Sequence, residues 1–181
     1  MNSKASHVHL RALEPADLQL VYDIENDVGL WPWGEQTVPY SKDVLTDYIA
    51  HSHWDLYADR QARLVVEVAD ESGCVDAGGA GTAVGLVDLC NFDPRHRRAE
   101  MAVAILSGWR GRGIARRALA QMEQIAHADG VELVYAITAD ANIAAGRLFA
   151  AAGYERACCL AGWLAAAQGQ RQDATLWIKR L

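Results

Sequence analysis

The sequence lacks the long apolar stretches that membrane-spanning helices need. No apolar run in its 181 residues approaches the ~18 residues that cross a bilayer as a helix. The first eleven residues, MNSKASHVHLR, also lack the apolar core of a secretory signal. We therefore expect a cytoplasmic protein that has no membrane partner.

Cysteine is scarce, and its pattern argues against a metal site. The four cysteines are Cys74, Cys90, Cys158 and Cys159. They form no CxxC pair, and no His-x-x-x-His pattern accompanies them, so the spacing of a zinc site is absent. The sequence predicts no bound metal, and we expect reduced, partly buried thiols.

Positive charge is in short supply over the whole chain but is concentrated in one segment. The formal net charge is −6, yet residues 95–117 contain seven arginines and one acid, Glu100. Residues 1–60 show the reverse balance, with ten acids and four bases. This distribution indicates either two ligand regions of opposite sign or an ordinary fluctuation of surface charge. Nucleic acid is not expected as a partner, because the basic segment is local and the sequence pI is about 5.4.

The common nucleotide-binding glycine motifs are missing as well. The P-loop pattern GxxxxGK[ST] does not occur, and GxGxxG would need Gly or Ala where Arg116 stands. What is present is GWRGRGIARRALAQM at residues 108–122, which places Gly111 and Gly113 between an apolar strand and an amphipathic helix. The first N–H groups of such a helix can bind an anion, and glycine allows a phosphate to approach the backbone. The alternative is a basic turn that only faces solvent.

The hydrophobic pattern predicts an α/β protein, of the α+β kind, with one domain over residues 1–181. Alternating or valine-rich segments predict a mixed sheet of six to seven strands, at 7–13, 62–69, 83–90, 97–106, 131–138, 155–166 and 173–181. Helical spacing predicts helices at 14–26, 41–53, 113–130 and 142–154. The strand–helix–strand order from 97 to 138 predicts that its two strands are parallel.

Two short motifs resemble those of the GNAT superfamily, the acyl-CoA-dependent N-acetyltransferases. RGRGIA is similar to the pyrophosphate motif (Q/R)-x-x-G-x-(G/A), with Arg110, Gly113 and Ala115 at its fixed positions. NIAAGRLFAAAGY resembles the later N-x-x-A-x-x-L-(Y/F)-x-x-x-G-(F/Y) helix, with Asn142, Ala145, Leu148, Phe149, Gly153 and Tyr154 in register. Other segments, including RLVVE and HRRAE, look like those of the bacterial spermidine/spermine N-acetyltransferase branch.

The resemblance implies a GNAT fold, in which flanking helices cover a sheet with a splayed parallel pair of strands. Acetyl-CoA, the acetyl donor, would lie between strands 99–106 and 131–138, where the backbone of Val103, Ala104 and Ile105 would pair with pantetheine. The pyrophosphate would lie against the turn formed by Arg110, Gly111, Arg112, Gly113, Ile114, Ala115 and Arg116. Asn142 and Arg147 would follow the later part of the cofactor.

The implied reaction is direct attack of an amine on the acetyl thioester. An alkyl ammonium has a pKa near 10 in solution and must lose a proton first. Glu100 is the candidate base, acting through water, and its alternative role is a salt bridge with Arg97 or Arg98. Related enzymes commonly protonate the departing thiolate with a tyrosine in the position of Phe149, which has no proton to donate.

The candidate substrate-binding residues are acidic or aromatic. Trp31, Trp33, Glu35 and Asp93 are the candidate substrate-binding residues, since carboxylates and aromatic rings suit a cation; the tryptophans are equally well explained as a cover over the sheet. The predicted function is acetyl transfer to a primary amine of a small, polyamine-like cation. The alternatives are an acyl-CoA-binding module with weak or no catalysis and an acetyltransferase for a peptide N-terminus or an aminoglycoside. The superfamily's frequent dimers also imply a homo-oligomer.

Overall fold

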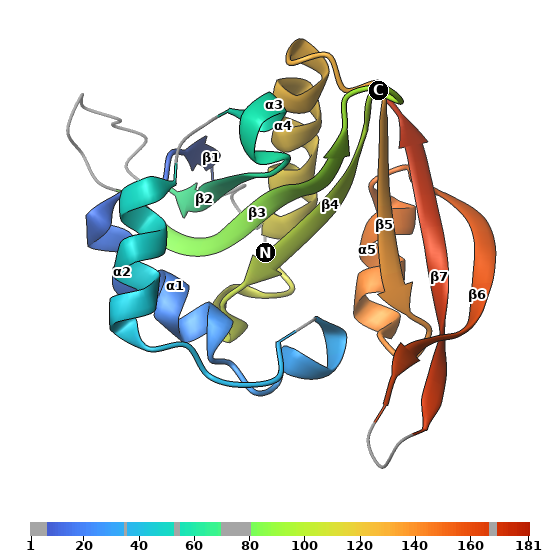
Figure 1. Cartoon of the computed structure of the whole chain (residues 1–181), viewed down its shortest axis with the longest axis horizontal. Coiled ribbons are helices and arrows are strands. Elements are labelled where there is room, and N and C mark those ends of the chain that lie inside the picture. Colours follow the sequence, from blue (N-terminus) through green and yellow to red (C-terminus); the bar gives the residue numbers. More distant parts are fainter. Residues whose placement is uncertain (1–6, 35, 53–54, 70–80, 167–169) are drawn as a thin grey trace, which may run out of the picture.

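The computed structural model describes residues 7–34, 36–52, 55–69, 81–166 and 170–181 (Figure 1). Its strands are β1 (Val8–Arg11), β2 (Ala62–Val68), β3 (Thr82–Asp93), β4 (Arg98–Ile105), β5 (Leu133–Ala139), β6 (Glu155–Ala165) and β7 (Arg171–Arg180). Its α-helices are α1 (Leu18–Glu25), α2 (Lys42–His51), α3 (Leu56–Asp59), α4 (Ile114–Ala128) and α5 (Ile143–Ala151). Three 3-10 turns, η1 (Pro15–Asp17), η2 (Trp31–Trp33) and η3 (Ser107–Trp109), complete the described elements.

The strands form one sheet of seven, in the order β1-β2-β3-β4-β5-β7-β6. The β4–β5 pair is parallel and the other neighbours are antiparallel. This parallel pair contains only three residue pairs, from Arg98↔Leu133 to Glu100↔Tyr135. Figure 1 shows β4 and β5 diverging beyond that point. The predicted mixed sheet with a splayed parallel pair is therefore confirmed.

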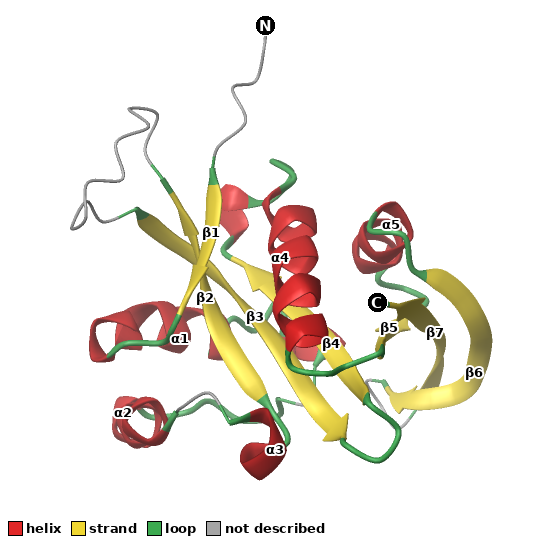
Figure 2. Cartoon of the chain, turned by 90° about the horizontal axis from the view of Figure 1, so that it is seen from above, coloured by secondary structure: helices red, strands yellow, loops and turns green. Residues whose placement is uncertain are grey.

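Helices cover both faces of the sheet, and each face has its own apolar core. Figure 2 shows α4 and α5 on one face and α1 and α2 on the other. The larger core packs Met122 of α4 and Phe149 of α5 against alternate residues of β3 to β5, such as Met101. The smaller core joins α1 and α2 to the opposite face through Val21, Leu86 and other apolar residues. Because side chains alternate along a strand, each β4 residue belongs to one of these two environments.

Local signals in the sequence explain where α4 and α5 begin. Gly113 precedes α4 with a φ of 73°, a left-handed conformation that glycine adopts without steric cost. The Asn142 side chain caps α5 by accepting a hydrogen bond from the Ala145 N–H at 3.1 Å. Gly153, with a φ of 86°, follows the end of α5. These starts and stops agree with the predicted helix boundaries.

The N-terminal half shows two departures from the pattern. Val44 of α2 is apolar and yet 53% exposed, whereas Leu45 and Ile49 are buried. The short helix α3 was not predicted, because four residues are too few to show helical periodicity. The Asp55 side chain caps it by accepting from the Ala58 N–H at 2.9 Å.

Candidate active site

The candidate site lies where β4 and β5 separate. Glu100 and Tyr135 form their last pair, after which neither strand continues the parallel ladder. Beyond this point β4 runs on to Ile105 and β5 to Ala139. The unpaired edge of a strand presents N–H and C=O groups that an extended ligand can use. We call this open region between the two strands the β4–β5 gap.

Strand alternation decides which β4 residues present their backbone to the gap. The Leu106 N–H donates to the Val84 carbonyl of β3 at 2.9 Å, and Ala104 is paired with Leu86. In an antiparallel ladder every second residue bonds the same neighbour, so the backbone groups of Ala104 also point to β3.

The backbone N–H and C=O groups point the other way, toward the gap, at Met101, Val103 and Ile105. This agrees with the Arg97 carbonyl, which accepts from β5-side N–H groups of Glu132 and Leu133. The backbone of Val103 therefore faces the gap and that of Ala104 faces β3, and their role toward pantetheine stays a prediction. Met101, which was not among the predicted residues, also presents its backbone to the gap, as the alternation of the strand implies.

The turn at the open end of the gap is built around two glycines in left-handed conformations. Gly111 has a φ of 75° and Gly113 a φ of 73°. A Cβ atom placed on either glycine would meet no atom within 4 Å, apart from the adjacent residues. The turn is therefore open in front of the α4 N-terminus, where Ile114, Ala115 and Arg116 have N–H groups without partners inside the helix. This open cradle with a positive helix end fits a pyrophosphate.

The arginines of this turn have different surroundings. The Arg110 Nε donates to the Ile105 carbonyl at 2.7 Å, and its guanidinium lies 3.6 Å from the Asp27 carboxylate. Arg112 donates to the Gly108 carbonyl at 2.9 Å and lies over the Trp109 ring. Arg116 is exposed on the first turn of α4. The side chain of Arg110 thus shapes the turn and uses a carbonyl that was predicted to pair with pantetheine.

On α5, the predicted cofactor residues lie at and near the helix start. The Asn142 side-chain oxygen is used as the helix cap, and Arg147 is exposed one turn later. Phe149 is buried and packs edge-to-face on Tyr154, with ring centres 5.0 Å apart. Tyr154 is thus a packing residue, as the sequence predicts.

Glu100 is placed on the α1/α2 face at the narrow end of the gap. Its carboxylate accepts a hydrogen bond from the Asn91 Nδ2 at 2.8 Å. The two arginines of its alternative role have other partners, since Arg97 pairs with Glu132 and Arg98 with Asp93. Glu100 is half-buried, and among the described residues its carboxylate forms no ion pair with Arg97 or Arg98.

A group of ionic residues that the sequence did not predict lies on the same face. The Arg63 guanidinium donates to Asp88 at 2.6 Å and to Glu25 at 2.7 Å, and it lies over the Tyr48 ring. Asp88 is paired with Ala102, one step beyond Glu100 on the same face. Arg63, Glu25 and Asp88 are each about one-fifth exposed. Nothing local in the sequence connects these residues, which are 25 and 38 positions from Arg63.

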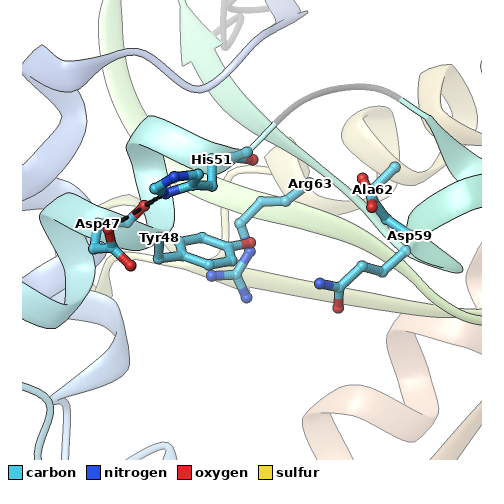
Figure 3. A pocket seen from close by; sticks show the side chains of 8 residues that line it. Asp47, Tyr48, His51, Asp59, Ala62 and Arg63 are labelled. Atoms are coloured by element: carbon cyan, nitrogen blue, oxygen red, sulfur yellow. Dashed lines mark hydrogen bonds and ion pairs between the residues drawn. The ribbon is translucent and has the colours of Figure 1, made fainter.

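A pocket of about 280 Å³ lies beside Arg63, between α2, α3 and the start of β2. Figure 3 shows the Tyr48 ring beside the Arg63 side chain, with Asp47 and His51 of α2 nearby, where the Asp47 Oδ1 and the His51 Nδ1 are 3.3 Å apart. The pocket is lined by Asp47, Tyr48, His51, Ser52, Asp59, Gln61, Ala62 and Arg63. Its carboxylates outnumber its guanidinium, so the pocket adds to the acidic character of this face.

Three of the four predicted substrate residues are described, with Trp31 and Trp33 in η2 and Asp93 at the end of β3. Trp31 lies in η2 and donates from its Nε1 to the Glu25 carbonyl at 2.9 Å, while Trp33 is 43% exposed. Asp93 holds the β3–β4 turn by accepting from the N–H groups of His96 and Arg95, and these bonds, His96 first, lower its pKa. Glu35 lies outside the described residues.

Two further observations concern metal-binding groups and membrane-spanning helices. Among the residues that the structure describes, no group of three or more His, Cys, Asp or Glu side chains could hold a metal ion. Within the same residues, no helix is long and apolar enough to cross a membrane.

Comparison with known families agrees with this geometry. The family model described as "Acetyltransferase (GNAT) domain" matches residues 7–155. The chain belongs to the GNAT acetyltransferase family. The predicted family and fold class are thereby confirmed.

Curated GNAT relatives of the chain include two spermidine acetyltransferases. Spermidine N(1)-acetyltransferase of Escherichia coli strain K12 is 31% identical over 115 residues, 63% of this chain and 54% of that protein. The Vibrio cholerae protein of the same name is 29% identical over 112 residues, 61% of this chain and 57% of that protein. The chain thus matches little more than half the length of these relatives.

Solved structures of the GNAT fold superpose on most of the chain. Spermidine N-acetyltransferase from Vibrio cholerae in complex with CoA and spermine has a TM-score of 0.78 over 96% of this chain and 95% of that chain, at 24% identity, which shows a shared fold. A dodecameric structure of spermidine N-acetyltransferase from the same organism has a TM-score of 0.72 at 25% identity, and covers 96% of this chain and 93% of that chain.

Proposed function

We propose that this GNAT protein transfers the acetyl group of acetyl-CoA to a primary amine of a small, polyamine-like cation. The observation that carries the proposal is the β4–β5 gap, which ends in the Gly111–Gly113 turn and has the Glu100 carboxylate at its narrow end. The turn fits the pyrophosphate of the acetyl donor, because its backbone is open and its helix end is positive. The acceptor amine would then meet the thioester from the α1/α2 face.

Residues of this gap supply the groups that the reaction needs. Glu100 takes the proton of the incoming ammonium through a water molecule, which leaves a neutral amine to attack the thioester carbonyl. The Val103 N–H points to the gap and stabilises the negative charge that develops on the carbonyl oxygen. The products are the acetylated amine and the thiol of CoA.

The charges of the α1/α2 face support a cationic acceptor. Glu25, Asp88 and Glu100 lie on this face with Arg63, which leaves an excess of negative charge. Opposite charge near a site raises the local concentration of a cationic substrate. The names of the curated relatives agree with this class, since both are spermidine acetyltransferases.

A substrate screen tests the proposed function directly. Thiol release from acetyl-CoA would be measured with spermidine, spermine, an aminoglycoside and a peptide with a free N-terminus. We expect turnover with the polyamines and little with the peptide. Faster turnover of the aminoglycoside or the peptide would reassign the acceptor class.

The second candidate function is an acyl-CoA-binding module without catalysis. The observation that favours it is Phe149, which is buried and has no hydroxyl in the position where related enzymes carry a tyrosine. Tight CoA binding measured by calorimetry, together with no thiol release for any amine, would establish this module instead of an enzyme.

We also propose that the chain assembles with copies of itself. Strand β6 is at the edge of the sheet, and Trp163 on this strand is 54% exposed. Exposed edges with large apolar side chains are common protein–protein contacts. Analytical ultracentrifugation at micromolar concentration would test this proposal, and a monomer at all concentrations would contradict it.

A further inference from the structure

Acetyl transfer leaves a thiolate that must gain a proton, and Phe149 cannot provide it. The Phe149 ring is buried against Tyr154 on the α4/α5 face. The Tyr154 hydroxyl is buried in the same core and has no hydrogen-bond partner among the described residues. Thr138 of β5, on the same face, accepts a hydrogen bond from the Trp177 indole N–H at 2.8 Å. The hydroxyl groups behind the gap are thus part of the core.

The opposite face of the sheet holds a hydroxyl directly at the narrow end of the gap. Cys90, Glu100 and Tyr135 occupy successive strands in one row of the sheet, since Cys90 pairs with Glu100 and Glu100 with Tyr135. Residues paired in register place their side chains on the same face. Tyr135 therefore lies beside Glu100, where β4 and β5 last meet.

We propose that Tyr135 is a second catalytic residue, which passes to the CoA thiolate the proton that Glu100 receives from the amine. This inference rests on the proposed acetyl transfer. In the first step the ammonium gives a proton to Glu100 through water. The amine nitrogen then forms a bond to the carbonyl carbon, and the carbon–sulfur bond breaks. In the last step the Tyr135 hydroxyl gives its proton to the sulfur and takes the proton held by Glu100.

The relay balances without any other reactant. One proton moves from the attacking ammonium to Glu100, and one proton reaches the sulfur. The second proton of the attacking amine leaves to water when the amide forms. Glu100 returns to a carboxylate and Tyr135 to a phenol, so both residues are ready for the next cycle.

The electrostatics around Tyr135 fit this role. Burial raises the pKa of Tyr135, and the Glu100 carboxylate and Cys90 raise it further, while Arg98 lowers it. The hydroxyl thus keeps its proton at neutral pH and can donate it. When Glu100 becomes protonated its charge no longer raises the pKa of Tyr135, so donation to sulfur becomes easier at the stage that needs it.

Tyr135→Phe tests the relay, because it removes the hydroxyl and keeps the ring. With spermidine as acceptor we expect kcat to fall about 100-fold, the lower end of a typical general acid–base contribution. The KM for acetyl-CoA should change less than twofold, because the hydroxyl acts only after the carbon–sulfur bond has broken. Tyr57→Phe is the matched control, since its hydroxyl lies on α3 against the Asp129 carbonyl at 3.4 Å. This control should keep the kcat of the parent protein.

A double-mutant cycle separates a relay from a structural role. Residues that move one proton in series act as a unit, so Glu100→Gln with Tyr135→Phe should be no slower than the slower single variant. Effects that multiply would overturn the relay, as would a kcat of Tyr135→Phe within twofold of the parent protein. No turnover by the parent protein with any amine would instead overturn the proposed function, and the relay with it.

Discussion

The Arg110 side chain joins the glycine turn to β4, because its Nε donates a hydrogen bond of 2.7 Å to the carbonyl oxygen of Ile105. Ile105 is the last residue of β4, and Arg110 lies at the start of the glycine turn. The same guanidinium lies 3.6 Å from Asp27, which follows α1. Arg110 therefore holds the turn against β4 and adds a positive charge where the pyrophosphate is proposed to bind.

We expect Arg110→Ala to raise the dissociation constant of CoA roughly tenfold, the effect of losing about 1.4 kcal/mol of charge-assisted hydrogen bonding. Calorimetric titration with CoA measures this constant. Arg180→Ala is the matched control, because it removes the same charge from an exposed position at the end of β7. An unchanged dissociation constant for Arg110→Ala would separate this side chain from the donor site.

Gly113 offers a second test of the cradle, because strain and charge can be separated there. Any side chain at a φ of 73° costs roughly 1 kcal/mol of stability. Gly113→Ala and Gly113→Asp should therefore lose similar stability in urea denaturation. Only Gly113→Asp should also weaken CoA binding more than tenfold, since its carboxylate would face the pyrophosphate. Equal CoA binding by the two variants would show that no phosphate lies at this turn.

The parts of the site that sequence alone could predict are those encoded by neighbouring residues. The α4 turn depends on glycines within a few positions of each other, and the α5 cap is formed between Asn142 and Ala145. Both features depend on residues that are close together in the sequence, so the predicted and observed starts of α4 and α5 agree. The alternating direction of the backbone groups along β4 could also be predicted from the sequence. It places the backbone of Met101 toward the gap and that of Ala104 toward β3.

The remaining parts depend on contacts between distant segments. Arg63 meets Glu25 and Asp88 only because β2 pairs with β3 and α1 packs on that face. Similarly, Lys179 of β7 reaches the buried Glu123 of α4 at 2.6 Å, across 56 positions of sequence. A single sequence contains no local signal for such pairs, since their geometry follows from the register of the sheet.

The Arg63 cluster should contribute strongly to stability. Arg63→Met would leave the carboxylates of Glu25 and Asp88 half-desolvated without their partner, which costs about 3 kcal/mol. Urea denaturation measures the loss. Adding Glu25→Gln and Asp88→Asn to Arg63→Met should recover part of it, because the uncompensated charges are then removed. A loss below 1 kcal/mol for Arg63→Met would mean that water compensates these carboxylates.

Asp17 should make the stability of the protein sensitive to acid. Burial alone would raise its pKa, but hydrogen bonds from Arg11 and from the Glu14 N–H lower it below the usual value. A lowered folded-state pKa means that this stabilisation is complete above the unfolded-state pKa of about 4 and is lost as the pH falls through the folded-state value. We expect Asp17→Asn to cost about 2 kcal/mol at pH 7, the value of hydrogen bonds to a charged group. Urea denaturation from pH 7 to pH 2 measures the free energy of unfolding of both proteins, and the difference between them should shrink below about pH 4. A difference that stays constant with pH would mean that the Asp17 charge contributes nothing to stability.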